Sequence, residues 1–148
     1  MNVVKVLRES SLFKGVDEKT INVIAHISET EDVPAETVVC AEGMDSDAMF
    51  VVASGRLEVS KDAADGTAEV MGELGAGDVI GALALVLEAT RAVTIKTKER
   101  AALIAITRDS FDKLAESNIH AAYAVLQSVT RYLAALVNKP EALEEILR

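Results

Sequence analysis

The alternation of apolar and polar positions divides the chain into a helical block, a block of short strands and a second helical block. Between residues 3 and 28, apolar side chains recur every three or four positions, the period of an amphipathic helix. Between residues 31 and 107, short β-rich runs are separated by turn-forming residues such as Asp65-Gly66. From residue 108 to 148 the helical period returns. The pattern predicts one α+β domain over residues 1–148, an antiparallel β-roll or jelly roll flanked by N-terminal and C-terminal helices.

The second helical block is expected to begin near Asp109-Ser110 and to hold a longer helix after Asn118. In this longer helix, four apolar residues follow one another at spacings of three, four and three: Leu126, Val129, Leu133 and Leu136. This a/d stripe covers less than two heptads and favours packing on the core over pairing with a second copy, although one stripe can serve both. Pro140 ends or interrupts the helix, and residues 141–148 are predicted to form a last short helix.

Composition narrows the partners that the domain can have. The chain holds 148 residues, and half of them are apolar, which is enough to bury a core without metals or disulfides. Its 24 acidic and 15 basic side chains give a formal net charge of -9. Because that charge repels a polyanion, no nucleic-acid partner is expected, whereas a small anion in a local positive spot remains compatible with it.

Cysteine content and hydropathy indicate the cellular location of the domain. The single cysteine, Cys40, cannot form an internal disulfide, so a reducing, cytoplasmic location is expected. The N-terminus has no apolar stretch of signal-peptide length. The most apolar runs, residues 79–87 and 101–106, are too short to span a bilayer, so no membrane partner is predicted.

The sequence contains few of the residue patterns that enzymes use. Metal-dependent jelly-roll enzymes need a cluster of inward-facing histidine and carboxylate ligands, whereas the two histidines, His26 and His120, both fall in helical segments. The sequence suggests no Ser-His-Asp or Cys-His arrangement and contains no P-loop. It therefore predicts a non-enzymatic domain with no catalytic residue, metal or cofactor.

The stretch GALALVLEATRAVTI, residues 81–95, places a lone arginine among apolar residues. A short helix that begins after Gly81 inside the roll would present free N–H groups, which favour an anion. Arg91 follows ten residues later, so the next strand can return its side chain to the same spot. Its planar fork suits phosphate, because it donates two parallel charged hydrogen bonds. On chemistry alone, an ion pair with Glu88 or Glu73 explains Arg91 equally well.

The same stretch resembles the phosphate-binding cassette of cyclic nucleotide-binding domains. The family pattern is Gly-Glu-Leu-Ala-Leu, then five residues, then Arg-Ala-Ala-Thr. The corresponding residues here are Gly81-Ala82-Leu83-Ala84-Leu85 and, after five residues, Arg91-Ala92-Val93-Thr94. Outside the cassette, the positions that match the family are Glu42-Gly43, Asp47, Phe50 and Gly55, and the resemblance covers roughly residues 10–137.

The resemblance implies a role for the cassette residues. Arg91 would pair with the cyclic phosphate, and Gly81 would let the backbone approach the sugar closely. Backbone N–H groups near Leu83, Ala84 and Ala92 would add hydrogen bonds to the phosphate. Ala92 is also the small residue usual in cAMP sites, and the last long helix would close over the base. The candidate ligand-binding residues are Gly81, Ala82, Leu83, Ala84, Arg91, Ala92 and Val93.

Two residues depart from the family pattern. Ala82 stands where the family has a glutamate that accepts a hydrogen bond from the ribose 2′-hydroxyl. Losing a charged hydrogen bond of about 1.5–3 kcal/mol is expected to weaken cyclic nucleotide binding by about ten- to a hundredfold. Glu36 replaces the glycine of the family's Pro-Ala-Gly turn, which indicates a changed turn.

Together these features predict a ligand-sensing regulatory module that binds cAMP or a related small phosphate ligand, with weakened affinity. Its output would pass to a second copy in a homodimer or to a separate protein partner. The alternative is a degenerate copy of the fold that has no ligand and serves as a protein-interaction or dimerisation module.

Overall fold

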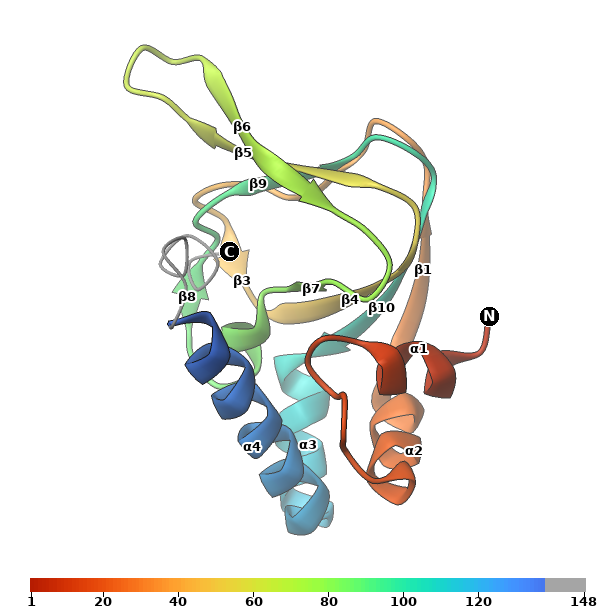
Figure 1. The fold of residues 1–148 in the computed structure, drawn as a ribbon. Helices are drawn as coiled ribbons and strands as arrows, with labels where there is room; N and C mark the ends of the chain where they lie inside the picture. The colour runs from red at the N-terminus through yellow and green to blue at the C-terminus, as the bar shows by residue number, and fades with distance from the viewer. Residues whose placement is uncertain (138–148) are drawn as a thin grey trace.

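The computed structural model describes residues 1–137 and shows a β-roll with helices gathered on one side of it (Figure 1). Two helices precede the roll, α1 (Val3–Glu9) and α2 (Glu18–Ile27), and two follow it, α3 (Arg108–Ser117) and α4 (Ile119–Leu136). This architecture confirms the predicted α+β class. The short helix predicted for residues 141–148 lies outside the described residues.

The roll is built from antiparallel strand pairs in two main sheets. The strands are β1 (Glu29–Val33), β2 (Val38–Cys40), β3 (Asp45–Ser46), β4 (Ala48–Ser54), β5 (Leu57–Asp62), β6 (Ala68–Leu74), β7 (Val79–Ile80), β8 (Ala89–Thr90), β9 (Thr94–Thr97) and β10 (Ala101–Thr107). One sheet has the order β1-β10-β4-β7, the other β2-β9-β5-β6, and β3 pairs with β8 alone. The predicted Asp65-Gly66 turn joins β5 and β6, which project from the roll as a hairpin (Figure 1).

Two apolar clusters lie on opposite faces of the β1-β10-β4-β7 sheet. Along β4, Met49 and Val51 belong to the cluster on the helix side, whereas Phe50 and Val52 belong to the cluster inside the roll. This alternation follows from the period of two of a strand, which sends successive side chains to opposite faces. The sheet is therefore one wall shared by both clusters.

Helix α4 packs its inner face against the helix-side cluster. Val125 and Val129 are buried there together with Leu85 of a short 3-10 helix, η1 (Ala82–Leu85). The stripe predicted from sequence is split in the structure, with its residues differing in exposure: Val129 (3%) and Leu136 (7%) are buried, Leu133 is partly buried and Leu126 is 40% exposed. Core packing is thus correct for part of the stripe and wrong for Leu126.

Within residues 1–137, no helix combines the length and the apolarity needed to cross a membrane.

The starts of the C-terminal helices are fixed by side-chain caps. The hydroxyl of Thr107 accepts a hydrogen bond from the Ser110 amide at 3.1 Å, so α3 begins earlier than the predicted Asp109-Ser110 start. The side chain of Asn118 accepts from the Ala121 amide at 3.1 Å and begins α4, as expected. Arg108 consequently sits in the first turn of α3.

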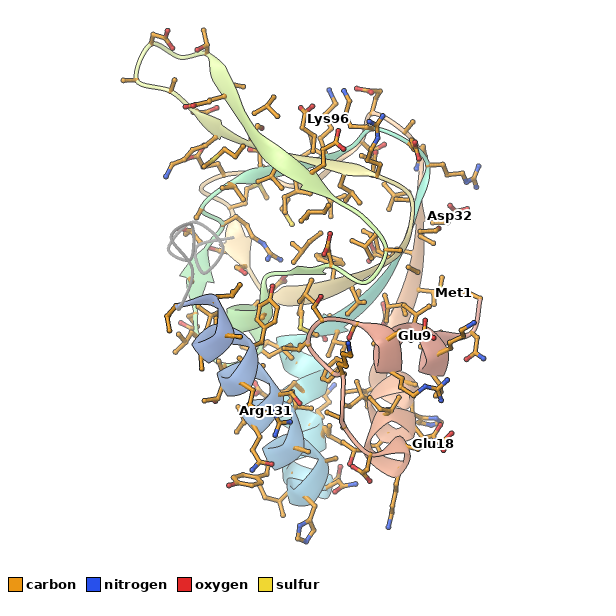
Figure 2. All side chains as sticks on the ribbon, in the orientation of Figure 1. Met1, Glu9, Glu18, Asp32, Lys96 and Arg131 are labelled. Atoms are coloured by element: carbon orange, nitrogen blue, oxygen red, sulfur yellow. The ribbon has the colours of Figure 1, made fainter. Side chains whose placement is uncertain are left out.

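Glu36 occupies a left-handed backbone conformation, with φ of 58°. Glycine adopts this conformation without a steric cost, so a glutamate stands here at a position whose backbone favours glycine. The Glu36 carboxylate lies 2.9 Å from Lys96 Nζ and 3.2 Å from Lys98 Nζ. Lys96 lies on the outer surface of the roll, away from the helices (Figure 2). Its hydrogen bond, and then that of Lys98, lowers the pKa of Glu36 below its usual value of 4.5.

We predict that Glu36→Gln lowers the free energy of unfolding near neutral pH and has no such effect in acid. A carboxyl group whose folded-state pKa is depressed stabilises the fold above its unfolded pKa, and this contribution disappears as the pH falls through the folded value. Urea unfolding at about pH 7 and about pH 3 measures the difference. Glu69→Gln, at an exposed position of β6, is the control. An equal loss for Glu36→Gln at both pH values would contradict the expectation.

Candidate anion-binding site

The cassette begins where β7 gives way to a tight left-handed turn. Gly81 has φ of 69° and ψ of 43° and precedes η1, the single 3-10 turn formed by Ala82–Leu85. Bonds from the Val86 and Leu87 amides to the Leu83 carbonyl, at 3.1 and 2.9 Å, close the end of this turn. The short helix predicted after Gly81 is therefore present, in its 3-10 form.

Backbone hydrogen bonds return Arg91 to the start of the cassette. The Arg91 amide donates to the Met44 carbonyl at 2.7 Å, and the Gly43 amide donates to the Arg91 carbonyl at 2.9 Å. These bonds follow the β3–β8 pair, in which Asp45 lies opposite Thr90. Arg91 is thereby fixed beside the chain that leads into β4.

The guanidinium of Arg91 is buried and has an unused donor. The residue is 7% exposed, and its Nη2 donates to the Ala48 carbonyl at 2.6 Å. Its Cζ stands 5.9 Å from the centroid of the Phe50 ring, within range of a cation–π contact. Nη1 is buried without a hydrogen-bond partner in the described part of the chain. A buried charged donor without a partner is costly, and an anionic acceptor would relieve that cost.

The ion-pair explanation of Arg91 is wrong. Glu73 pairs with Arg56 instead, at 3.2 Å. Among residues 1–137, no carboxylate, Glu88 included, lies within 4.0 Å of the Arg91 guanidinium. The positive charge is left unpaired by the residues that the structure describes.

Gly81 and Arg91 meet at a distance that only glycine permits. A Cβ atom built on Gly81 would lie 2.1 Å from Arg91 Nη1 and 3.3 Å from the Ala48 carbonyl oxygen. Nη1 therefore points at the Gly81 backbone. The two residues that the sequence singled out by spacing lie in direct contact.

The remaining predicted site residues lie around this contact in different environments. Ala82 is 7% exposed and packs into the helix-side cluster, whereas Val93 packs into the cluster inside the roll. Leu83 and Ala92 are half-buried. The Ala84 amide, one of the expected phosphate donors, donates to the Gly81 carbonyl at 2.9 Å within the 3-10 turn.

Arg108 is a second arginine at the cassette that the sequence did not reveal. Its Nε donates to the Ala84 carbonyl at 2.8 Å, and its Nη2 donates to the carbonyls of Leu87, at 2.9 Å, and Ser46. No sequence pattern marks such a residue, because its partners are backbone carbonyls that every residue carries.

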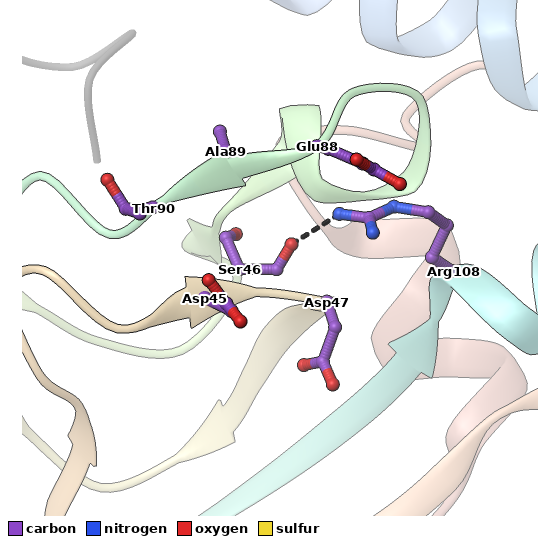
Figure 3. A pocket seen from close by; sticks show the side chains of 7 residues that line it. All are labelled: Asp45, Ser46, Asp47, Glu88, Ala89, Thr90 and Arg108. Atoms are coloured by element: carbon purple, nitrogen blue, oxygen red, sulfur yellow. Dashed lines mark hydrogen bonds between the residues drawn. The ribbon is translucent and has the colours of Figure 1, made fainter.

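Arg108 also lines an acidic pocket of about 460 Å³ between β3 and β8 (Figure 3). Three carboxylates, those of Asp45, Asp47 and Glu88, line the same pocket. The pocket repels anions and does not include Arg91. Within residues 1–137, no group of three or more histidine, cysteine, aspartate or glutamate side chains is arranged to hold a metal ion.

The β-roll with flanking helices is the architecture of a class of small regulatory domains. The chain belongs to the cyclic nucleotide-binding domain family, whose family model matches residues 30–118. This range covers more than half of the 148 residues.

Known proteins similar to the chain include both an enzyme and regulatory proteins. Lysophospholipase NTE1 of Coccidioides immitis is 30% identical over 120 residues, which are 79% of this chain and 8% of that protein. The chain thus spans less than a tenth of the length of this curated relative. The regulatory domain of Toxoplasma gondii PKA, co-crystallised with cAMP, is 34% identical with a TM-score of 0.68, over 75% of this chain and 42% of that one.

The fold is also shared with the N-terminal domain of a transcriptional regulator from Streptomyces coelicolor A3(2). The two superpose with a TM-score of 0.80 at 22% identity, over 90% of this chain and 93% of that chain. At this identity the likeness shows the fold.

We expect Gly81→Ala to lower the free energy of unfolding by about 1–3 kcal/mol, the cost of a left-handed non-glycine residue. The added methyl group also has to displace the Arg91 guanidinium, since it would lie 2.1 Å from Nη1. Gly75→Ala is the matched control, because a Cβ there meets nothing within 4 Å and its φ is not positive. Chemical denaturation of both variants tests this contact, and equal stabilities would contradict it.

Proposed function

We propose that this domain is a ligand-sensing regulatory module that binds cAMP, or a related small phosphate ligand, at Arg91. The observation that carries the proposal is the buried Nη1 of Arg91, which has no acceptor among residues 1–137 and points at the Gly81 backbone. The cAMP co-crystal of the similar Toxoplasma gondii regulatory domain supports this choice of ligand.

A small phosphate fits the electrostatics of the site better than a larger anion. The net charge of -9 repels a polyanion, and Arg91 is a buried cation with one donor left unused among the described residues. Nη2 is committed to the Ala48 carbonyl at 2.6 Å, so Nη1 is the donor that the ligand would use. One charge-assisted bond at a buried position suits one phosphoryl oxygen.

Binding is weak in this proposal, because position 82 offers no charged acceptor to a ribose hydroxyl. Ala82 instead packs its methyl group into the helix-side cluster. The contribution lost is about 1.5–3 kcal/mol, so the affinity for a cyclic nucleotide is about ten- to a hundredfold lower than with a glutamate there.

Signalling follows from the core that η1 shares with α4. Leu85 of η1 packs in the same cluster as Val125 and Val129 of α4. A ligand that draws the cassette towards Arg91 favours the arrangement of α4 that packs best on the moved cassette. The domain acts by this shift and has no catalytic role in our proposal. The lysophospholipase activity in the name of the fungal relative belongs to a much longer protein.

The reducing compartment stays part of the proposal. Cys40 is 5% exposed, and burial raises the pKa of its thiol, so it is a small apolar residue and a poor nucleophile. A domain with one buried thiol fits the cytoplasm.

We further propose that the domain forms a homodimer through the outer face of α4. Exposed apolar residues recur along this face at Ile119 (65%), Tyr123 (60%), Leu126 (40%) and Val137 (60%). Thr130 and Leu133 fill the gap, so the spacing is four, three, four, three and four. Arg131 is the one Lys, Arg, Asp or Glu residue in the 18 residues of α4, so no carboxylate of the helix opposes a second copy. The heptad seam is therefore shifted from the one predicted from sequence.

Isothermal titration calorimetry with cAMP, cGMP and inorganic phosphate tests the ligand. We expect cAMP to bind and Arg91→Gln to weaken binding at least tenfold, the value of a charged hydrogen bond. Arg100→Gln is the control, because Arg100 is exposed and pairs with Asp32 on the outside of the roll. If the folded wild-type protein binds none of the three ligands, the ligand-free interaction module is the better description.

Sedimentation velocity tests the dimer. We expect the wild-type protein to dimerise and Tyr123→Glu to shift it to monomer, because a carboxylate would then oppose its twofold mate. Ala135→Glu adds the same charge to an exposed position of α4 that faces away from the stripe at 3.6 residues per turn. Wild-type protein that stays monomeric at high concentration would rule out the α4 dimer.

A further inference from the structure

Three consecutive carbonyl groups, from the end of β3 to the start of β4, accept hydrogen bonds from two arginines. The Ser46 carbonyl accepts from Nη2 of Arg108, and the Asp47 carbonyl accepts from the Arg108 amide at 2.8 Å. The Ala48 carbonyl accepts from Nη2 of Arg91 at 2.6 Å. The segment of residues 46–48 therefore links the arginine of the candidate anion site to the arginine at the start of α3.

Arg108 also holds the far end of the cassette. Its Nε binds the Ala84 carbonyl at 2.8 Å, and its Nη2 binds the Leu87 carbonyl at 2.9 Å. The last carbonyls of a helix lack partners inside the helix, and cationic side chains often bind them. Arg108 supplies this cap to η1 from another element of the fold.

The Arg108 side chain is positioned by hydrogen bonds to backbone carbonyls and not by an ion pair. Asp45, Asp47 and Glu88 line the same pocket, yet none of the carboxylates in residues 1–137 forms an ion pair with Arg108. Figure 3 shows the side chain reaching past Glu88 and Asp47 to Ser46. Because Thr107 caps α3, the backbone of Arg108 is held in the first turn of that helix.

We propose that Arg108 is a positioning residue that couples the Arg91 site to the start of α3. An anion that binds Nη1 moves the Arg91 guanidinium together with the Ala48 carbonyl that Nη2 holds. This moves the segment of residues 46–48, and Arg108 passes the movement to η1 and α3. Coupling is reciprocal, so a change in the hydrogen bonds of Arg108 also changes the affinity of the Arg91 site for an anion. The ligand part of this inference rests on the proposed function, whereas the coupling between the two arginines does not.

Amide hydrogen exchange without ligand tests whether the Arg108 hydrogen bonds stabilise the cassette. In Arg108→Gln, the amides of Val86 and Leu87, which close η1 on the Leu83 carbonyl, should exchange roughly 5- to 150-fold faster, the range of a typical coupling. The Ile104 amide in the core should change little, whereas a merely structural defect would accelerate it as well. Arg100→Gln is the matched control, and Arg108→Lys should restore part of the protection.

A double-mutant cycle tests the link between the arginines. The effects of Arg91→Gln and Arg108→Gln on the unfolding equilibrium constant should depart from additivity by at least about fivefold. Arg91→Gln combined with Arg100→Gln should be additive, because Arg100 shares no partner with Arg91. If Arg108→Gln does not fold, Arg108→Lys takes its place in both measurements, and the expected changes keep their direction and become smaller.

Calorimetry with cAMP adds the ligand arm. Arg108→Gln should weaken binding at least about fivefold, although Arg108 itself is not part of the proposed ligand site, and Arg100→Gln should leave it unchanged. If the wild-type protein does not bind cAMP, the proposed function fails, while exchange and the cycle still decide the role of Arg108. Exchange at Val86 and Leu87 equal to that of the control, together with an additive cycle, would overturn the inference.

Discussion

Burial of one guanidinium against one glycine is the constraint on which the candidate site depends. Arg91 is 7% exposed, and its Nη1 takes the space that any side chain at position 81 would fill. Three features bring Gly81 and Arg91 into contact: the left-handed turn at Gly81, the 3-10 turn η1 and the pairing of β8 with β3. A buried positive charge that has no carboxylate partner among residues 1–137 is costly, and a bound anion would lower that cost.

The sequence was sufficient for the parts of the molecule that depend on local pattern. Alternating apolar residues and turn signals gave the strand block, and the spacing between Gly81 and Arg91 brought out a pair that the fold places in contact. The capping of α3 was missed because Thr107 ends a β-rich run and reads as strand. The left-handed φ of Glu36 could not be predicted from the sequence, because the residue type disfavours it, and its ion pairs with Lys96 and Lys98 depend on the fold.

Other features depend on contacts that no local pattern records. Arg108 binds carbonyl groups, which carry no side-chain identity, so nothing in the sequence separates it from the other basic residues. The face of α4 that meets the roll is chosen by the position of the roll. The stripe that starts at Leu126 therefore combined buried and exposed residues, whereas the exposed apolar residues of α4 start at Ile119.

The sheet β1-β10-β4-β7 has an evolutionary consequence, because both of its faces are covered by apolar clusters. Met49 and Phe50 are neighbours in one strand but belong to different clusters, so a substitution on the helix side reaches the interior of the roll through the backbone of β4. Substitutions in the helical layer can thus alter the surroundings of Arg91, whose Cζ lies 5.9 Å from the centroid of the Phe50 ring, while Gly81 and Arg91 themselves are retained.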